Sequence, residues 1–91
     1  MPSNKESSWF VYILRCADNS LYTGITIDVD KRLNEHNGIT KNGAKYTQGR
    51  RPVKLAYIEA IESRSEACKR ESMIKSLKKV EKEFLISEKT L

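Results

Sequence analysis

The chain has 91 residues, 32% of them charged, and a formal net charge of +5 at pH 7. This length allows one domain with a modest core and leaves no room for a second module, while the excess of positive charge favours a polyanionic partner. No apolar run reaches the length of a membrane span, and the polar residues 1–8 lack the apolar core of a signal peptide and are expected to form a disordered tail. Cys16 and Cys68 are expected to be reduced thiols of a cytoplasmic protein.

A β-hairpin is predicted near the N-terminus. Residues 9–14 and 21–26 are rich in aromatic and β-branched side chains, with turn-forming residues between them. A three-residue loop would place Tyr12 opposite Gly24 and put Tyr12 and Tyr22 on one face of the sheet, whereas a two-residue turn would put them on opposite faces. Gly24 favours the first register, because a glycine inside a strand often marks the close approach of a ligand, a backbone or a large ring.

A helix is predicted over residues 28–37, with Thr26 or Asp28 as its N-cap. Arg32 and His36 are four residues apart and lie on one helical stripe, while a separate apolar stripe is expected to pack on the sheet. Taken alone, Arg32 also fits an exposed ion pair with Asp28, and His36 fits a surface position near the end of the helix.

Residues 38–51 are predicted to form a functional loop. They contain three glycines, four basic residues and no apolar period, and the stretch between Glu35 and Glu59 has no acidic residue. A loop this long is uncommon in so small a domain unless it has a function, although a flexible solubilising loop is the alternative. Tyr46 offers a ring that can stack on a base or sugar while neighbouring cations hold phosphates. The predicted nucleic-acid-binding residues are Lys41, Lys45, Tyr46, Arg50 and Arg51.

A third strand is predicted over residues 53–61, where Val53, Leu55 and Tyr57 alternate with the residues between them. Three strands suffice for a stable small sheet. We therefore expect an α/β fold of two layers, with a three-stranded, mainly antiparallel sheet flanked by helices in the order β-β-α-β-α-α. The domain is expected to span residues 9–87, followed by a C-terminal tail over residues 88–91.

The longest helix is predicted over residues 63–79, because Ser63 and Glu66 form a capping box. Glu71 lies at the border of its apolar stripe, where a carboxylate must be hydrated, paired or bound to a cation. An ion pair with Lys75 is the structural alternative. The inward stripe is expected to comprise Ala67, Met73, Ile74 and Leu77. A second short helix is expected to follow.

These residues, in this order, resemble the GIY-YIG nuclease domain, and specifically its small stand-alone bacterial proteins of the UPF0213 type. The resemblance covers residues 9–86 and rests on VYI at 11–13, YTG at 22–24, Arg32, His36, GAKYTQGRRPVKLAYIE at 43–59 and Glu71. The chain departs from the family pattern at Val11 and Thr23, where the family name has glycine and isoleucine. It also has no asparagine after Asn42, although many members have one in the last helical region.

The resemblance implies metal-dependent hydrolysis of a phosphodiester in DNA, with catalytic residues Tyr12, Tyr22, Arg32, His36 and Glu71. Tyr12 or Tyr22 would take a proton from the attacking water, and Arg32 would stabilise the transferring phosphoryl group. His36 would orient the reacting groups or donate a proton to them, and Glu71 would hold Mg²⁺ or Mn²⁺. The expected substrate is branched or single-stranded DNA in repair or recombination. The alternative is a nucleic-acid binder of the same fold that does not cut.

Overall fold

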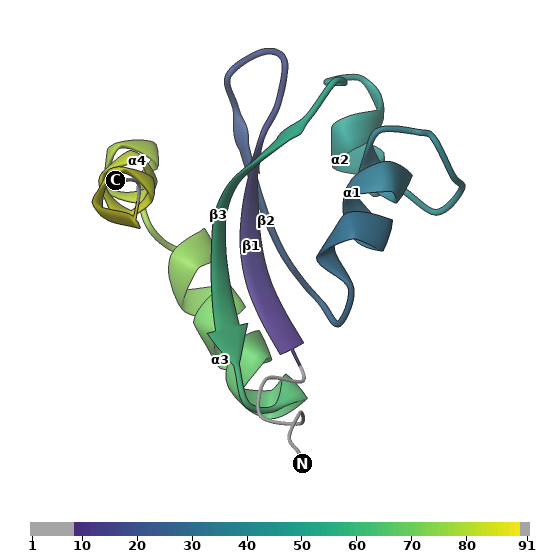
Figure 1. The fold of residues 1–91 in the computed structure, drawn as a ribbon. Coiled ribbons are helices and arrows are strands. Elements are labelled where there is room, and N and C mark those ends of the chain that lie inside the picture. The colour runs from purple at the N-terminus through teal and green to yellow at the C-terminus, as the bar shows by residue number, and fades with distance from the viewer. Residues whose placement is uncertain (1–8, 90–91) are drawn as a thin grey trace.

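The structure is a computed structural model that describes residues 9–89, so the tail predicted over residues 1–8 lies outside the described residues. Its elements in chain order are β1 (Trp9–Arg15), β2 (Leu21–Thr26), α1 (Val29–His36), α2 (Lys45–Gln48), β3 (Lys54–Ile61), α3 (Arg64–Lys75) and α4 (Lys79–Lys89) (Figure 1). The strands form one antiparallel sheet in the order β2-β1-β3, which confirms the predicted α/β fold class. The short α2 helix lies inside the segment predicted to be a loop.

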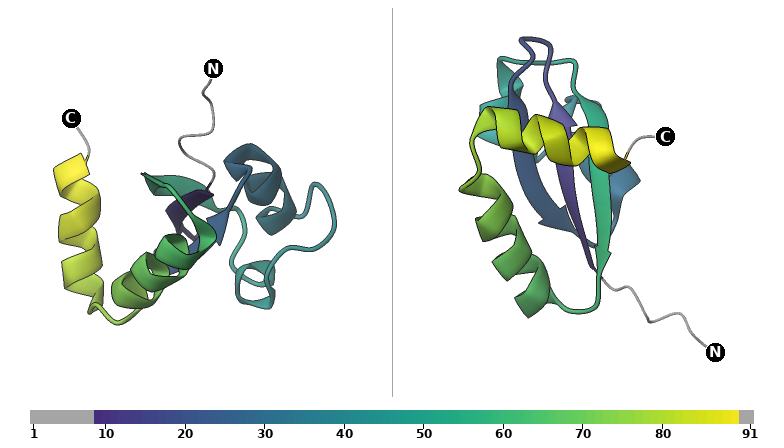
Figure 2. Two further views of the ribbon diagram at one scale, coloured as in Figure 1. Left: turned by 90° about the horizontal axis from the view of Figure 1, so that it is seen from below. Right: turned by 90° about the vertical axis from the view of Figure 1, so that its left-hand side faces the viewer.

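Helices cover both faces of the sheet, whereas the sequence indicated one helical layer. α1 and α2 lie on one face, and α3 and α4 lie on the other (Figures 1 and 2). The central strand explains this arrangement, because Val11, Tyr12, Ile13 and Leu14 are all buried, so consecutive side chains on both faces of β1 need cover. A continuous apolar run of this kind is typical of a strand buried on both sides.

The core is divided by the sheet into two clusters. The cluster under α3 and α4 contains Val11, Ile13, Tyr57, Ala67, Ile74 and Ile86. The cluster on the α1 face contains Tyr12, Leu14, Cys16 and Val53, with Tyr22 and Leu33 packed against it. Cys16 and Cys68 are both free thiols, as predicted. None of the helices within residues 9–89 combines the length and the apolar character needed to cross a bilayer.

The hairpin has the register that places both tyrosines on one face. Tyr12 pairs with Gly24 and Leu14 pairs with Tyr22, as the three-residue loop predicts. The turn is closed by hydrogen bonds from the Cys16 and Asn19 backbone, and Asn19 has a φ of 70°. Asparagine tolerates this left-handed conformation better than most residues.

A bulge on β3 changes which face its side chains occupy. Ile13 pairs with Tyr57 but Leu14 pairs with Leu55, so β3 contains one extra residue at this point. The side chains of β3 on the two sides of the bulge therefore do not point to the two faces of the sheet in one continuous alternation. Tyr57 packs under α3, whereas Val53 packs on the Tyr12 face and Leu55 is exposed. The predicted single apolar face of Val53, Leu55 and Tyr57 is wrong for this reason.

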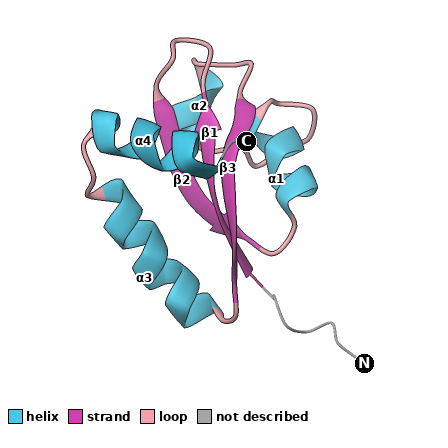
Figure 3. Ribbon diagram, turned by 60° about the vertical axis from the view of Figure 1, so that its left-hand side comes forward, coloured by secondary structure: helices cyan, strands magenta, loops and turns pink. Residues whose placement is uncertain are grey.

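The two C-terminal helices meet the far face of the sheet at different angles (Figure 3). Ser63 caps α3 by accepting a hydrogen bond from Glu66 N at 3.2 Å, as predicted. The predicted inward position of Met73 is wrong, since its side chain is 48% exposed. Met73 lies about 120° around the helix from buried Ala67, at 3.6 residues per turn. α4 continues to Lys89, so part of the expected C-terminal tail is helical.

Candidate active site

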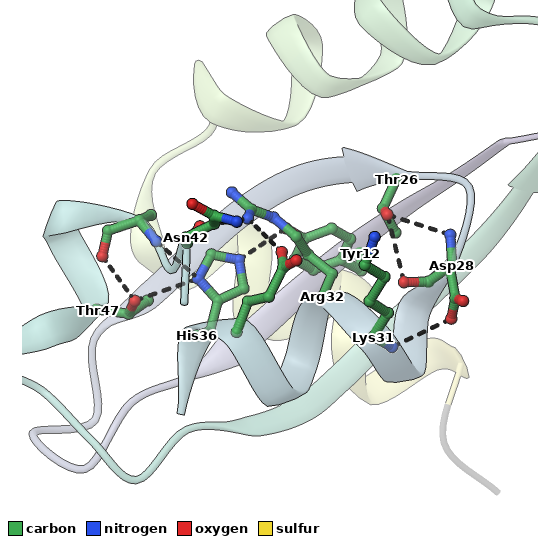
Figure 4. A network of polar contacts seen from close by, with 10 residues as sticks. Tyr12, Thr26, Asp28, Lys31, Arg32, His36, Asn42 and Thr47 are labelled. Carbon is green, nitrogen blue, oxygen red and sulfur yellow. Dashed lines mark hydrogen bonds and ion pairs between the residues drawn. The ribbon is translucent and has the colours of Figure 1, made fainter. Parts of the chain in front are cut away.

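Two tyrosines of the hairpin and the single histidine of the chain meet on the α1 face of the sheet. The Tyr12 hydroxyl oxygen is 2.9 Å from His36 Nε2 (Figure 4). The Tyr22 ring lies 5.0 Å from the His36 ring and 6.5 Å from the Tyr12 ring, measured between centroids. Tyr12 is 2% exposed and His36 is 0% exposed, so the surface position considered for His36 does not occur.

Gly24 makes room for this arrangement. A Cβ atom at residue 24 would lie 2.5 Å from the Tyr12 hydroxyl oxygen and 2.7 Å from its Cζ. Real side chains do not approach this closely, so only glycine leaves the Tyr12 ring in its place across the hairpin. Of the close approaches that a glycine in a strand can mark, the one at Gly24 is that of a large ring, Tyr12.

Both ends of α1 are fixed by side chains, and this positions Arg32 and His36. Asp28 caps the helix by accepting a hydrogen bond from Lys31 N at 3.1 Å. At the other end, the Asn37 amide accepts from Val53 N at 2.7 Å and donates to Val53 O at 3.0 Å. Asp28 therefore sets where the helix begins, and Asn37 ties its end to the residue before β3, with Arg32 and His36 one turn apart between them.

The Arg32 guanidinium is held by one of its terminal nitrogens. This nitrogen donates to Glu35 Oε1 and to the Asn42 carbonyl, both at 2.7 Å (Figure 4). The Arg32 side chain remains 28% exposed, and its positive charge opposes the rise in the pKa of Tyr12 that burial causes. It does not pair with Asp28, which was the structural alternative. A guanidinium carries five N–H donors, so the anchored fork can still offer donors to a phosphate.

Burial keeps both members of the Tyr12–His36 pair uncharged near neutral pH. Burial raises the pKa of Tyr12 to about 12, although Arg32 acts in the opposite direction. Burial also lowers the pKa of His36 to about 4, and the positive charge of Arg32 adds to this effect. The resting pair is therefore a phenol hydrogen-bonded to a neutral imidazole.

Thr47 is a member of the site that the sequence did not reveal. Its hydroxyl oxygen lies 3.1 Å from His36 Nδ1 and donates to the Ala44 carbonyl at 2.8 Å (Figure 4). Thr47 is 0% exposed because α2 turns it inward. A threonine in a polar glycine-rich segment carries no periodic signal. Glu35 was also missed, although its position three residues after Arg32 allowed an i,i+3 ion pair.

Glu71 belongs to α3, which lies on the other side of the sheet from α1 (Figure 1). Burial is the main cause that raises the pKa of Tyr12, and the negative charge of Glu71 acts in the same direction. It also forms the ion pair with Lys75 that was its structural alternative, with a nitrogen to oxygen distance of 3.2 Å. Lys75 is exposed, so this i,i+4 pair holds the carboxylate only weakly.

The basic loop is more ordered than a flexible linker. Arg50 lies over the Tyr46 ring at 4.1 Å and pairs with Asp18 at 3.2 Å, while the Tyr46 ring lies 5.6 Å from that of Tyr22. Arg51 donates from Nε to the His36 carbonyl at 2.7 Å, at the end of α1.

Lys41 and Lys45 are exposed and form no ion pair within residues 9–89. Of the predicted nucleic-acid-binding residues, these two lysines therefore carry charges that no ion pair within residues 9–89 neutralises. Arg50 and Arg51 stabilise the loop itself.

The cavity at the turn end of the hairpin is separate from this site. It has a volume of about 240 Å³ and is lined by Arg15, Cys16, Ala17, Asn19, Pro52 and Lys54. None of the predicted catalytic residues lines it. The candidate site is therefore a cluster of contacting side chains beside α1, apart from this cavity.

The family model of the GIY-YIG catalytic domain matches residues 8–83 of the chain. The chain belongs to the GIY-YIG family. Its relatives include the UPF0213 protein of Desulfotalea psychrophila, 51% identical over 93% of this chain and 76% of that protein. The UPF0213 protein of Syntrophus aciditrophicus is 52% identical over 87% of this chain and 90% of that protein.

Solved structures agree with this assignment. The solution NMR structure of the UPF0213 protein from Bacillus halodurans matches with a TM-score of 0.58 and 46% identity, covering 89% of this chain and 84% of that one. A solution NMR structure of an E. faecalis protein matches with a TM-score of 0.57 and 39% identity, covering 94% and 90%. Membership of a catalytic-domain family indicates a nuclease that acts on nucleic acid.

The metal ligands available to this GIY-YIG domain are few. Within residues 9–89, no group of three or more His, Cys, Asp or Glu side chains is placed to hold a metal ion. Mg²⁺ does not need such a cage, because it keeps several waters and often binds one carboxylate together with a substrate phosphate. A partly exposed Glu71 carboxylate, paired only with a surface lysine, fits that kind of site.

Proposed function

We propose that this GIY-YIG domain is a metal-dependent DNA endonuclease that hydrolyses a phosphodiester bond. The observation that carries the proposal is the 2.9 Å contact of the Tyr12 hydroxyl with His36 Nε2, one turn of α1 away from Arg32. A proton acceptor at a hydroxyl, with a phosphate-binding cation beside the pair, is what water attack on a phosphodiester requires.

Tyr12 is the better candidate of the two tyrosines for the proton-accepting role. Its hydroxyl has a nitrogen acceptor 2.9 Å away, whereas Tyr22 meets His36 through its ring. As water attacks phosphorus, a water O–H bond breaks and its proton passes to the Tyr12 oxygen, while the Tyr12 proton passes to His36 Nε2. The negative charge stays on the phosphoryl oxygens and the leaving oxygen, so no free phenolate is needed.

Arg32 is the group that would stabilise this charge. A guanidinium is always ionised and binds phosphate oxygens through a fork of N–H donors. Because Glu35 and Asn42 hold one terminal nitrogen, the guanidinium is already oriented before DNA binds. A donor that is already in place costs no reorganisation during the reaction.

Glu71 is the residue that would hold Mg²⁺ or Mn²⁺. When bound, such an ion stabilises negative charge on phosphate oxygens and lowers the pKa of a coordinated water. Glu71 itself would supply a carboxylate ligand to the ion, and its negative charge helps to keep Tyr12 protonated.

DNA would bind along the basic loop beside α1. Lys41 and Lys45 would contact phosphates. Arg50 partly covers the Tyr46 ring, so Tyr46 would present a ring edge to the strand and Arg50 a guanidinium. A domain with so few base-reading groups is suited to branched or single-stranded DNA, which agrees with a role in repair or recombination in the cytoplasm.

A second candidate function is nucleic-acid binding without cleavage. The deep burial of Tyr12 and its high pKa favour this alternative, because a buried phenol is a poor base unless the ion and the substrate change its surroundings. Both functions share the same basic loop, so binding alone does not separate them.

Cleavage of labelled branched and single-stranded DNA in Mg²⁺ or Mn²⁺ separates the two functions. We expect the native protein to cut, and Y12F and E71Q each to lose about 10² or more in rate. Y57F and E66Q are the matched controls: the first changes a buried tyrosine on the other face, and the second an exposed glutamate of the same helix. Binding by the native protein without cleavage would favour the alternative, and cleavage that survives Y12F and E71Q would point to a contaminating nuclease.

A further inference from the structure

The contacts of His36 determine which of its ring nitrogens carries the proton. The Tyr12 hydroxyl oxygen lies 2.9 Å from Nε2, and the Thr47 hydroxyl oxygen lies 3.1 Å from Nδ1 (Figure 4). A neutral imidazole donates from one nitrogen and accepts at the other. Only the tautomer with a bare Nε2 can take a proton from Tyr12.

The partners of Tyr12 identify Nε2 as an acceptor. Tyr12 is 2% exposed, and within residues 9–89 its hydroxyl has one hydrogen-bond partner, His36. The protonated Tyr12 hydroxyl needs an acceptor for its own hydrogen, since a buried O–H group without one is costly. His36 Nε2 lies in hydrogen-bonding reach and fills that role.

The partners of Thr47 identify Nδ1 as a donor. The single hydroxyl hydrogen of Thr47 goes to the Ala44 carbonyl at 2.8 Å, so toward His36 the oxygen can only accept. Ala44 N, at 3.4 Å from Nδ1, would favour the opposite tautomer, but it is the longest of these contacts. A distance of 3.4 Å exceeds the ordinary range for N–H donors, so the Thr47 contact prevails.

We propose that Thr47 is a positioning residue, which holds His36 in the tautomer protonated on Nδ1 and so leaves Nε2 free to accept the proton of Tyr12. Its catalytic consequence rests on the nuclease function proposed above. As Tyr12 receives the proton of the attacking water, its own proton forms a bond to Nε2. The resulting imidazolium keeps its Nδ1–H bond to Thr47, which stays in place throughout the step.

The tautomer is directly measurable because His36 is the only histidine of the chain. With ¹⁵N-labelled histidine, NMR at pH 7 distinguishes a protonated from an unprotonated ring nitrogen in the free protein, without DNA or metal. We expect the wild type and T47S to carry the proton on Nδ1. T47V keeps the volume but removes the acceptor, so its His36 should shift toward the form protonated on Nε2.

T23V is the matched control for loss of a buried threonine hydroxyl. Thr23 is buried on β2, and its hydroxyl is unpartnered within residues 9–89. T23V should leave the tautomer unchanged, and the backbone amide spectrum of each variant reports whether it is folded. A wild type protonated on Nε2, or a folded T47V with the same tautomer as the wild type, would overturn the proposal.

Cleavage assays on the same variants keep this inference separate from the proposed function. If the protein cuts DNA, T47V should lose about 10² in rate with its KM for DNA little changed, and T47S should recover most of the loss. A wild type that shows the Nδ1–H tautomer but never cuts would defeat the nuclease proposal and leave the role of Thr47 in fixing His36 intact. Cleavage by T47V at the wild-type rate would defeat the role of Thr47 in the reaction.

Discussion

At the scale of single residues, the site depends on Gly24 as much as on the polar groups. In G24A, the new Cβ would fall 2.5 Å from the Tyr12 hydroxyl, so the ring must leave its contact with His36. We expect G24A to lose about 1–3 kcal/mol of unfolding free energy, the usual cost of overpacking, together with most of any cleavage activity. Denaturant titration and the cleavage assay measure the two effects.

G49A is the control for this prediction. A Cβ at Gly49 would meet no atom within 4 Å, and the residue has a φ of −95° that alanine can adopt. Its stability should change by no more than about 0.5–1 kcal/mol, with any change toward stabilisation. An equal loss in both variants would mean that the effect at Gly24 has nothing to do with Tyr12.

His36 makes the stability of the fold dependent on pH. Its pKa falls from 6.5 to about 4 on folding, chiefly through burial, with Arg32 and Arg51 lowering it further and Glu35 opposing them. The unfolded chain therefore binds more protons between these values, and stability must fall as the pH drops from 6.5 to about 4. The expected loss is on the order of 2–3 kcal/mol at the lower end of this range. Urea titrations across this range should show it, and H36Q should flatten that part of the curve.

At the scale of elements, α4 is attached to the sheet by one two-pronged ion pair. Both terminal nitrogens of Arg15 donate to Glu83 at 2.7 Å, and Lys79 adds a contact at 3.2 Å. The hydrogen bond from Arg15 is the main cause that lowers the pKa of Glu83 from 4.5 to about 2. This stabilisation is present above pH 4.5 and is lost as the pH falls through about 2.

E83Q should loosen α4 without disturbing the Tyr12 face. We expect a loss of about 1 kcal/mol or less, because the pair is partly exposed to solvent, and faster amide exchange confined to α4. E88Q changes an exposed glutamate of the same helix and should leave exchange unchanged. Faster exchange in α1 of E83Q would show that the two faces of the sheet are coupled.

The sequence predicted the elements of the fold better than the contacts between them. Hairpin register and helix caps follow from local rules, and Gly24 favoured the register that places the Tyr12 ring across from it. The β3 bulge and the inward turn of Thr47 depend on tertiary packing, for which the sequence offers no periodic signal. Glu71 was found through the family resemblance, since its local pattern fits the ion pair with Lys75 equally well.

At the scale of the whole molecule, positive charge occurs on both sides of the sheet, and only the α1 side carries Tyr12, Arg32 and His36. Lys41 and Lys45 belong to the loop near α1, whereas Lys78 and Lys82 lie at α4 on the opposite side (Figures 1 and 2). Net charge alone would make all four equivalent for DNA binding. If DNA binds along the loop beside α1, the four lysines contribute unequally to binding, because only lysines that neutralise phosphates cause counterions to be released from the DNA.

A pair of double variants with identical net charge tests this asymmetry. K41Q/K45Q should weaken DNA binding severalfold and reduce the slope of log K against log salt by about 0.7–0.9 for each phosphate that the variant no longer neutralises. K78Q/K82Q should leave both the affinity at moderate salt and the slope close to wild type. Titrations of labelled DNA at several salt concentrations measure the slopes directly. Equal slopes for the two variants would mean that the chain binds DNA through its overall charge, and that the loop beside α1 is no binding path.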